Sequence, residues 1–143
     1  MDTLLQVLLN GILNGMLYAL VALGLCLIWG VMDVINFAHG EYVMVAMYVS
    51  YWLGFLANVD PLISTLAGGA LIFILGALTY KLIIHYTVGK PPLSALLATF
   101  GLAMLLKNLC LNRFTPNFRI LSDTWLGDRT FQLGDLIVPL PQL

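Results

Sequence analysis

A polar segment of nine residues, Asp33–Glu41, interrupts an otherwise apolar stretch of the sequence and carries Asp33, Asn36, His39 and Glu41. Ionisable side chains among membrane-spanning segments are costly, and where they occur they commonly serve an ion or substrate route. A polar linker between two helices is the alternative interpretation, because any linker at a membrane surface must contain polar residues. Composition alone leaves both interpretations open.

Enzymatic chemistry has little support in the sequence. His39 and Glu41 have the spacing that begins a zinc deaminase motif, but no Pro-Cys-x-x-Cys segment follows. HExxH and GxSxG motifs are also absent. The two cysteines, Cys26 and Cys110, lie inside apolar runs and are interpreted as small packing residues. The sequence therefore predicts no catalytic residues, no metal site and no cofactor.

The composition identifies the elements that must position this segment as membrane helices. Of the 143 residues, 61% are hydrophobic and only 9% are charged, whereas soluble domains are about 25% charged. The mean hydropathy is +0.97. We therefore expect an integral membrane protein. With a net charge of −1 and no basic patch, nucleic acid is not an expected partner.

Hydropathy along the chain predicts an all-α membrane protein, a polytopic bundle of about four helices. The second helix is short for a full crossing, which takes about 20 residues, unless the polar segment before it is partly immersed. A charged loop at about 112–136 follows the fourth helix, and the apolar end of the chain resembles the approach to a fifth. Residues 1–143 are thus expected to be the N-terminal part of a single longer domain, with helices at about 4–31, 42–56, 62–84 and 93–111.

Charge suggests an orientation. The connection after the third helix carries Lys81, His85 and Lys90 and no acid, which favours a cytoplasmic location. The polar segment is then on the cytoplasmic side, and both the N-terminus and the 112–136 loop lie outside. The arginines of that loop oppose this assignment, because the rule counts Lys and Arg rather than net charge.

Small residues recur every fourth position on the helices. Membrane helices pack closely where such residues meet, so these stripes predict a compact bundle. Packing within the chain is one interpretation of the first stripe, and contact with a second subunit is the other. The expected packing residues are Gly11, Gly15 and Ala19 on the first helix, and Ala46, Ser50 and Gly54 on the second.

The position of the polar segment favours a functional interpretation. A short helix preceded by a polar, glycine-containing break indicates a discontinuous membrane helix beside a substrate route. Glu41 lies at the start of the second helix, where the helix dipole favours a carboxylate. We therefore expect Asp33, Asn36, His39 and Glu41 to shape a substrate pathway or its gate.

The amino-acid sequence of this region resembles that of a known family. Residues 24–41, GLCLIWGVMDVINFAHGE, are similar to the hallmark of the membrane permeases of branched-chain amino acid ABC importers. The opening LNGILNGMLYAL at 9–20 and the segment from Pro91 to Asn108 also resemble the family. Lys90-Pro91 stands where the family usually has Arg-Pro. The resemblance extends over essentially the whole chain, and the 35–41 heptapeptide is its most specific part.

The resemblance implies a multi-pass translocation subunit of the bacterial inner membrane. Its implied partners are a second permease, two cytoplasmic ATPases that hydrolyse ATP, and a periplasmic amino-acid-binding protein. Family members are considerably longer, and the later loop that docks on the ATPase has no counterpart in these residues. Urea, short amides or other amino acids are alternative substrates within the family. A small membrane scaffold that binds partner helices is the alternative from another class.

Overall fold

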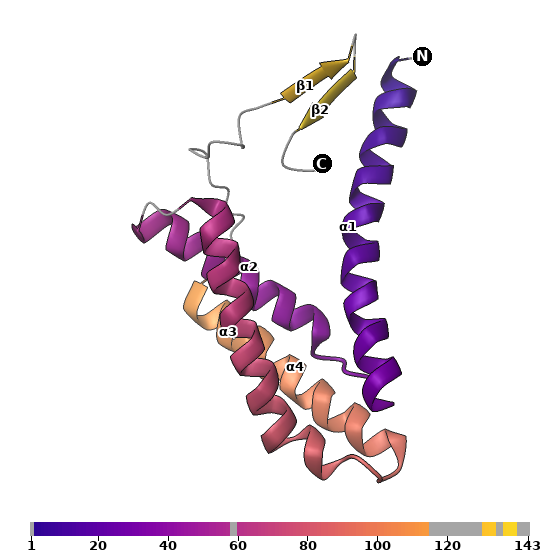
Figure 1. Cartoon of the computed structure of the whole chain (residues 1–143), viewed down its shortest axis with the longest axis vertical. Helices are drawn as coiled ribbons and strands as arrows, with labels where there is room; N and C mark the ends of the chain where they lie inside the picture. Colours follow the sequence, from indigo (N-terminus) through magenta and orange to yellow (C-terminus); the bar gives the residue numbers. More distant parts are fainter. Residues whose placement is uncertain (1, 58–59, 115–129, 134–135, 140–143) are drawn as a thin grey trace.

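The computed structural model describes residues 2–57, 60–114, 130–133 and 136–139. Four α-helices make up most of the described chain (Figure 1). A single 3₁₀ turn, η1, follows α3, and two short strands pair near the end of the chain. The elements are α1 (Asp2–Met32), α2 (His39–Ala57), α3 (Pro61–Leu82), η1 (Ile84–Tyr86), α4 (Pro92–Phe114), β1 (Thr130–Leu133) and β2 (Leu136–Pro139).

A helical membrane-protein bundle was the expected fold class, and it is confirmed. Three of the helical segments found in the described chain are long and apolar enough to cross a membrane: Leu4–Met32, Ile63–Tyr86 and Pro92–Phe114. The 19-residue helix α2 is not among them. A helix rises about 1.5 Å per residue, so α2 falls slightly short of the hydrocarbon core of about 30 Å.

A fifth helix was expected to begin near the end of the chain, but the described residues there form two strands instead. Strands β1 and β2 pair antiparallel there, with Phe131 opposite Val138 and Leu133 opposite Leu136. In the sequence two short apolar runs flank Gly134-Asp135, a dipeptide type that favours a two-residue hairpin connection. Pro139 also disfavours continued helix, because proline lacks the amide hydrogen that a helix interior needs.

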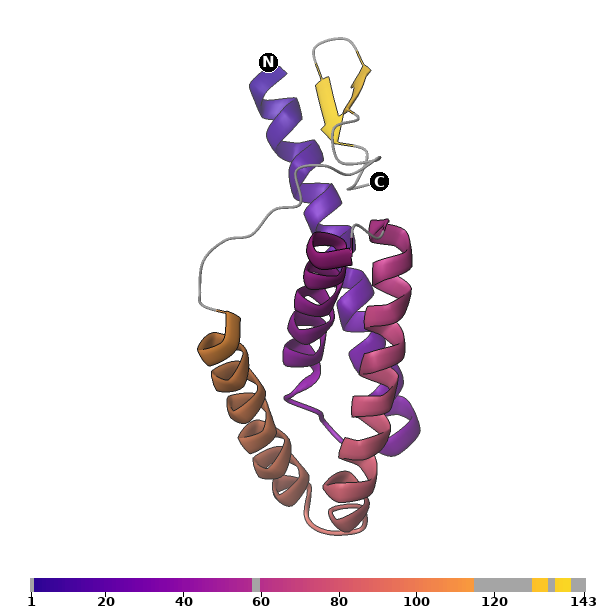
Figure 2. The same cartoon turned by 90° about the vertical axis from the view of Figure 1, so that its left-hand side faces the viewer.

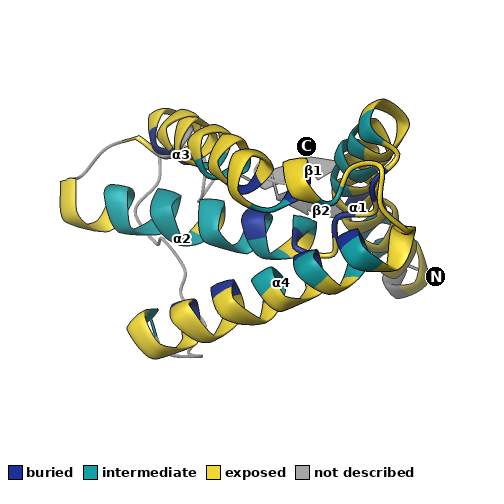
Figure 3. Ribbon diagram, turned by 90° about the horizontal axis from the view of Figure 1, so that it is seen from below, coloured by how far each residue is buried: buried dark blue, intermediate teal, exposed yellow. Residues whose placement is uncertain are grey.

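Helices α2, α3 and α4 lie beside one another, whereas α1 stands apart over most of its length (Figures 1 and 2). Among residues 4–32 of α1, only Leu13 is buried. Many large apolar side chains of α1 are exposed, and exposed residues also dominate the outer faces of α3 and α4 (Figure 3). Such surfaces suit lipid or further membrane helices rather than water.

One close contact between α2 and α3 involves a glycine. A Cβ atom at Gly68 of α3 would lie 2.8 Å from Ser50 Oγ and 3.2 Å from the Ala46 carbonyl oxygen of α2. Ser50 Oγ also donates a hydrogen bond to the Ser64 carbonyl oxygen at 3.2 Å. Ala46 and Ser50 therefore lie at a contact between helices, while Gly54, further along α2, is half-buried.

The small-residue stripe of α1 has a different environment. A Cβ atom added at Gly11 or Gly15 would meet nothing within 4 Å, and Ala19 is exposed. No neighbouring element of the described chain packs closely on this stripe.

Candidate functional site

The chain between α1 and α2 is unwound over residues 33–38. Asp33 has a φ of 51°, in the left-handed region, and its amide donates a 2.8 Å hydrogen bond to the Trp29 carbonyl oxygen. Aspartate is one of the few residue types other than glycine that visit this region readily. Asp33 thus ends α1, and the polar segment forms a true break between two helices.

Side chains satisfy the backbone amides that the break releases from helical hydrogen bonding. The Ala38 amide donates to Asn36 Oδ1 at 3.0 Å, an Asx turn that precedes α2. The Phe37 amide donates to Thr99 Oγ1 of α4 at 3.2 Å. Asn36 is 5% exposed and Thr99 is fully buried. Without such partners these amides would be unsatisfied in apolar surroundings, which is strongly unfavourable.

His39 links the start of α2 to the middle of α1. Its Nε2 lies 3.0 Å from the Val21 carbonyl oxygen, and since a carbonyl can only accept, Nε2 carries the hydrogen. The ring lies so close to Gly24 that a Cβ atom there would be 3.1 Å from His39 Cε1. This glycine therefore lets the imidazole approach the α1 backbone.

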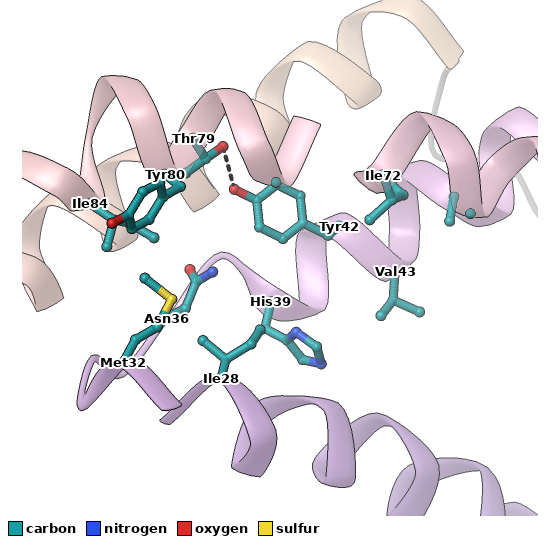
Figure 4. A pocket seen from close by; sticks show the side chains of 13 residues that line it. Ile28, Met32, Asn36, His39, Tyr42, Val43, Ile72, Thr79, Tyr80 and Ile84 are labelled. Carbon is teal, nitrogen blue, oxygen red and sulfur yellow. Dashed lines mark hydrogen bonds between the residues drawn. The ribbon is translucent and has the colours of Figure 1, made fainter. Parts of the chain in front are cut away.

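A cavity of about 440 Å³ lies between the break, α1, α2, α3 and η1 (Figure 4). Its volume falls within the range of small-molecule sites, roughly 300–1,000 Å³. Most of the lining is apolar, and polar groups come from α2, α3 and the break. The lining residues are Ile28, Met32, Asn36, His39, Tyr42, Val43, Ala46, Gly69, Ile72, Gly76, Thr79, Tyr80 and Ile84.

The buried Tyr42 hydroxyl donates a 2.7 Å hydrogen bond to Thr79 Oγ1 (Figure 4). Thr79 in turn donates to the Leu75 carbonyl oxygen at 2.8 Å. This chain of hydrogen bonds leaves both hydroxyl groups satisfied and fixes α2 against α3 beside the cavity.

Asn36 is buried, and the hydrogen-bonding capacity of its side chain is only partly used. Its Oδ1 accepts from the Ala38 amide, and because that partner is a donor the orientation of the side-chain amide is determined. Its Nδ2 has no hydrogen-bond partner among the described residues. The side chain lines the cavity, so it offers a donor to a molecule bound there.

The four residues expected to form a pathway do not gather in one place. Asn36 and His39 line the cavity described above. Asp33 is exposed and lines a second cavity of about 800 Å³, together with Lys90 of the connection before α4. Glu41 is half-buried in the first turn of α2 and lines neither of these two cavities.

The site also includes Tyr42, Thr79 and Thr99, which are not among the residues expected from the sequence. Tyr42 and Thr79 are 37 residues apart, and Phe37 and Thr99 are 62 apart, so no local pattern joins them. The available signal was a threonine inside an otherwise apolar helix, which needs a hydrogen-bond partner. Within the described residues, no three His, Cys, Asp or Glu side chains gather as a metal site.

Long apolar helices, a break between two of them and a mostly apolar cavity with a free amide donor define a polytopic helical membrane protein with a small-molecule cavity. Comparison with known proteins identifies its family. Residues 7–133 match the family described as branched-chain amino acid transport system / permease component. The chain therefore belongs to this permease family.

Curated relatives include the high-affinity branched-chain amino acid transport system permease protein LivH of Salmonella typhimurium and of Escherichia coli K12, and BraD of Pseudomonas aeruginosa. Each is 32% identical to this chain over 112 residues, which cover 73% of the chain. The match spans 36% of the length of each relative. No solved structure matches the chain.

The hydrogen bond from Phe37 to Thr99 predicts a specific loss of stability. Thr99→Val preserves the shape of the side chain but removes the acceptor, so we expect the free energy of unfolding to fall by about 1–3 kcal/mol. Thr99→Ser retains the hydroxyl group and should be less destabilising than the valine variant. Denaturant unfolding of the purified protein in detergent micelles measures both. Equal stability of Thr99→Val and the wild type would contradict this role.

Proposed function

We propose that this chain is part of the translocating subunit of an ATP-driven importer of branched-chain amino acids in the bacterial inner membrane. The observation that carries the proposal is the cavity at the α1–α2 break, with its free amide donor and apolar walls, in a chain of this permease family. The subunit performs no covalent chemistry, and separate ATPases hydrolyse the ATP.

The cavity offers partners for two groups of a branched-chain amino acid, the carboxylate and the aliphatic side chain. Asn36 Nδ2 is available to donate to the carboxylate, and the N-terminus of α2 begins three residues further on, at His39. A helix N-terminus stabilises negative charge, and broken membrane helices commonly use it to bind anionic substrate groups. Ile28, Met32 and Ile72 provide apolar surface for the aliphatic side chain.

In this proposal the four polar residues have different roles in the route. Asn36 binds substrate, and His39 holds the start of α2 against α1 through Val21 while its ring lines the cavity. Asp33 and Glu41 belong to the gate. Asp33 ends α1 beside the second cavity, and Glu41 is half-buried in the first turn of α2.

Partners are needed to complete the transporter. We infer a second permease subunit, cytoplasmic ABC ATPases and a periplasmic amino-acid-binding protein. The exposed apolar face of α1 and its uncovered Gly11–Ala19 stripe support contact with further membrane helices, because small residues allow close approach between helices. The matched part spans 36% of the curated relatives.

Two substitutions of Asn36 test the role of its amide. Asn36→Asp retains an oxygen for the Ala38 amide but replaces the free donor with a carboxylate, which repels the substrate carboxylate. We expect uptake of labelled leucine to fall at least about tenfold, the effect of 1.4 kcal/mol, while membrane levels stay normal. Asn36→Ala loses both functions and should lower the amount of protein as well.

These variants are placed in the chromosomal gene, so that the chain works with its own partners, and a strain lacking the gene gives the background. Immunoblots of membranes measure the protein level. Wild-type uptake by Asn36→Asp at a normal protein level would exclude the proposed contact. Uptake of leucine that is equal in the wild type and the deletion strain would exclude the transport function itself.

The proposed orientation places the α3–α4 connection in the cytoplasm and the α2–α3 connection outside. Val88 and Asp60 are exposed residues of these two connections. In a background without Cys26 and Cys110, a membrane-impermeant maleimide added to spheroplasts should label Asp60→Cys and not Val88→Cys. Inverted membrane vesicles should give the opposite result. Labelling of Val88→Cys in intact spheroplasts would reverse the orientation.

A further inference from the structure

Glycine occupies two positions of α3 that line the cavity at the break. Gly69 and Gly76 are seven residues apart and lie on the same helical face as Ile72, Thr79 and Tyr80. The cavity therefore has two stretches of α3 wall without side chains.

Neither glycine is required by the backbone or by packing between the described helices. Both lie inside a regular helix, and the positive φ among the described glycines is at Gly89. A Cβ atom at Gly69 or Gly76 would meet nothing within 4 Å, in contrast to Gly68, where Ser50 Oγ is 2.8 Å away. Glycine also weakens a helix interior relative to alanine. The open volume in front of these residues is therefore the feature that glycine preserves.

Asn36 lies at one end of the cavity, and Gly76 is the nearer of the two glycines to that end. Asn36, Met32, Tyr80 and Ile84 lie together at one end of the cavity (Figure 4), where Met32 packs on the cluster that contains Ile84. The other end is marked by the contact between α2 and Gly68, the neighbour of Gly69.

The two glycines lie at different distances from Tyr80 along the axis of α3. Gly76 is one helical turn from Tyr80, about 6 Å along the axis, and Gly69 is about 10 Å further. An amino acid whose carboxylate accepts from Asn36 Nδ2 would extend its side chain toward Gly76. The buried amide donor that faces this cavity is the independent sign of a ligand.

We propose that Gly76 determines the size of the amino-acid side chain that the cavity accepts, with the absent side chain making room for the branched aliphatic group. The inference rests on the proposed transport function and adds to it the residue that separates longer from shorter aliphatic substrates. Gly69 lies beyond the reach of a leucine side chain and has a smaller effect.

Uptake of leucine and valine, which differ by one methylene, tests the proposal. Gly76→Val fills the space, so kcat/KM for leucine should fall more than kcat/KM for valine. The ratio of the two values should change by about tenfold, the low end of the discrimination that one methylene provides. Gly76→Ala should shift the ratio in the same direction by less. Gly101→Val is the matched control, because Gly101 lies inside α4, meets nothing within 4 Å and is outside this cavity.

The outcomes are distinct when the variants are made in the chromosomal gene and membrane protein levels are measured. The proposal is supported if the ratio of kcat/KM for leucine to kcat/KM for valine changes in both Gly76 variants and stays unchanged in Gly101→Val. Equal losses for leucine and valine in the Gly76 variants would contradict it and indicate that another helix packs in this space. No leucine or valine uptake by the wild type would contradict the transport function, and this inference with it.

Discussion

The break between α1 and α2 depends on one constraint: amide groups released from helical hydrogen bonding in apolar surroundings must find partners. Asn36 and Thr99 supply them for Ala38 and Phe37. The Phe37–Thr99 bond connects the break to α4, while His39 connects it to α1. The satisfied break therefore helps to determine how three of the four helices meet.

The same constraint accounts for the chemistry of the cavity. Because α1 and α2 are separate helices, their faces enclose a space with α3 instead of forming one continuous wall. Asn36 uses its oxygen to stabilise the break and leaves its nitrogen facing that space. A structural requirement of the fold thus places a hydrogen-bond donor in a mostly apolar cavity, next to the positive end of the α2 dipole.

Hydropathy was sufficient to predict the four helices, because long apolar segments have few alternatives in a membrane. The polar segment around Asn36 indicated where the helix pair is interrupted. Contacts between distant residues, such as Tyr42 with Thr79, could not be predicted, since they depend on how the helices pack. The wrong expectation of a fifth helix start came from counting apolar residues while neglecting the Gly134-Asp135 turn signal.

The central claim is that leucine occupies the cavity at the break. Val43 of α2 lines the cavity, and Met47, one turn further along α2, is exposed and does not line it. In the complete transporter without Cys26 and Cys110, we expect saturating leucine to slow thiol modification of the Val43→Cys variant and leave the rate for Met47→Cys unchanged. Equal modification of Val43→Cys with and without leucine would contradict the account.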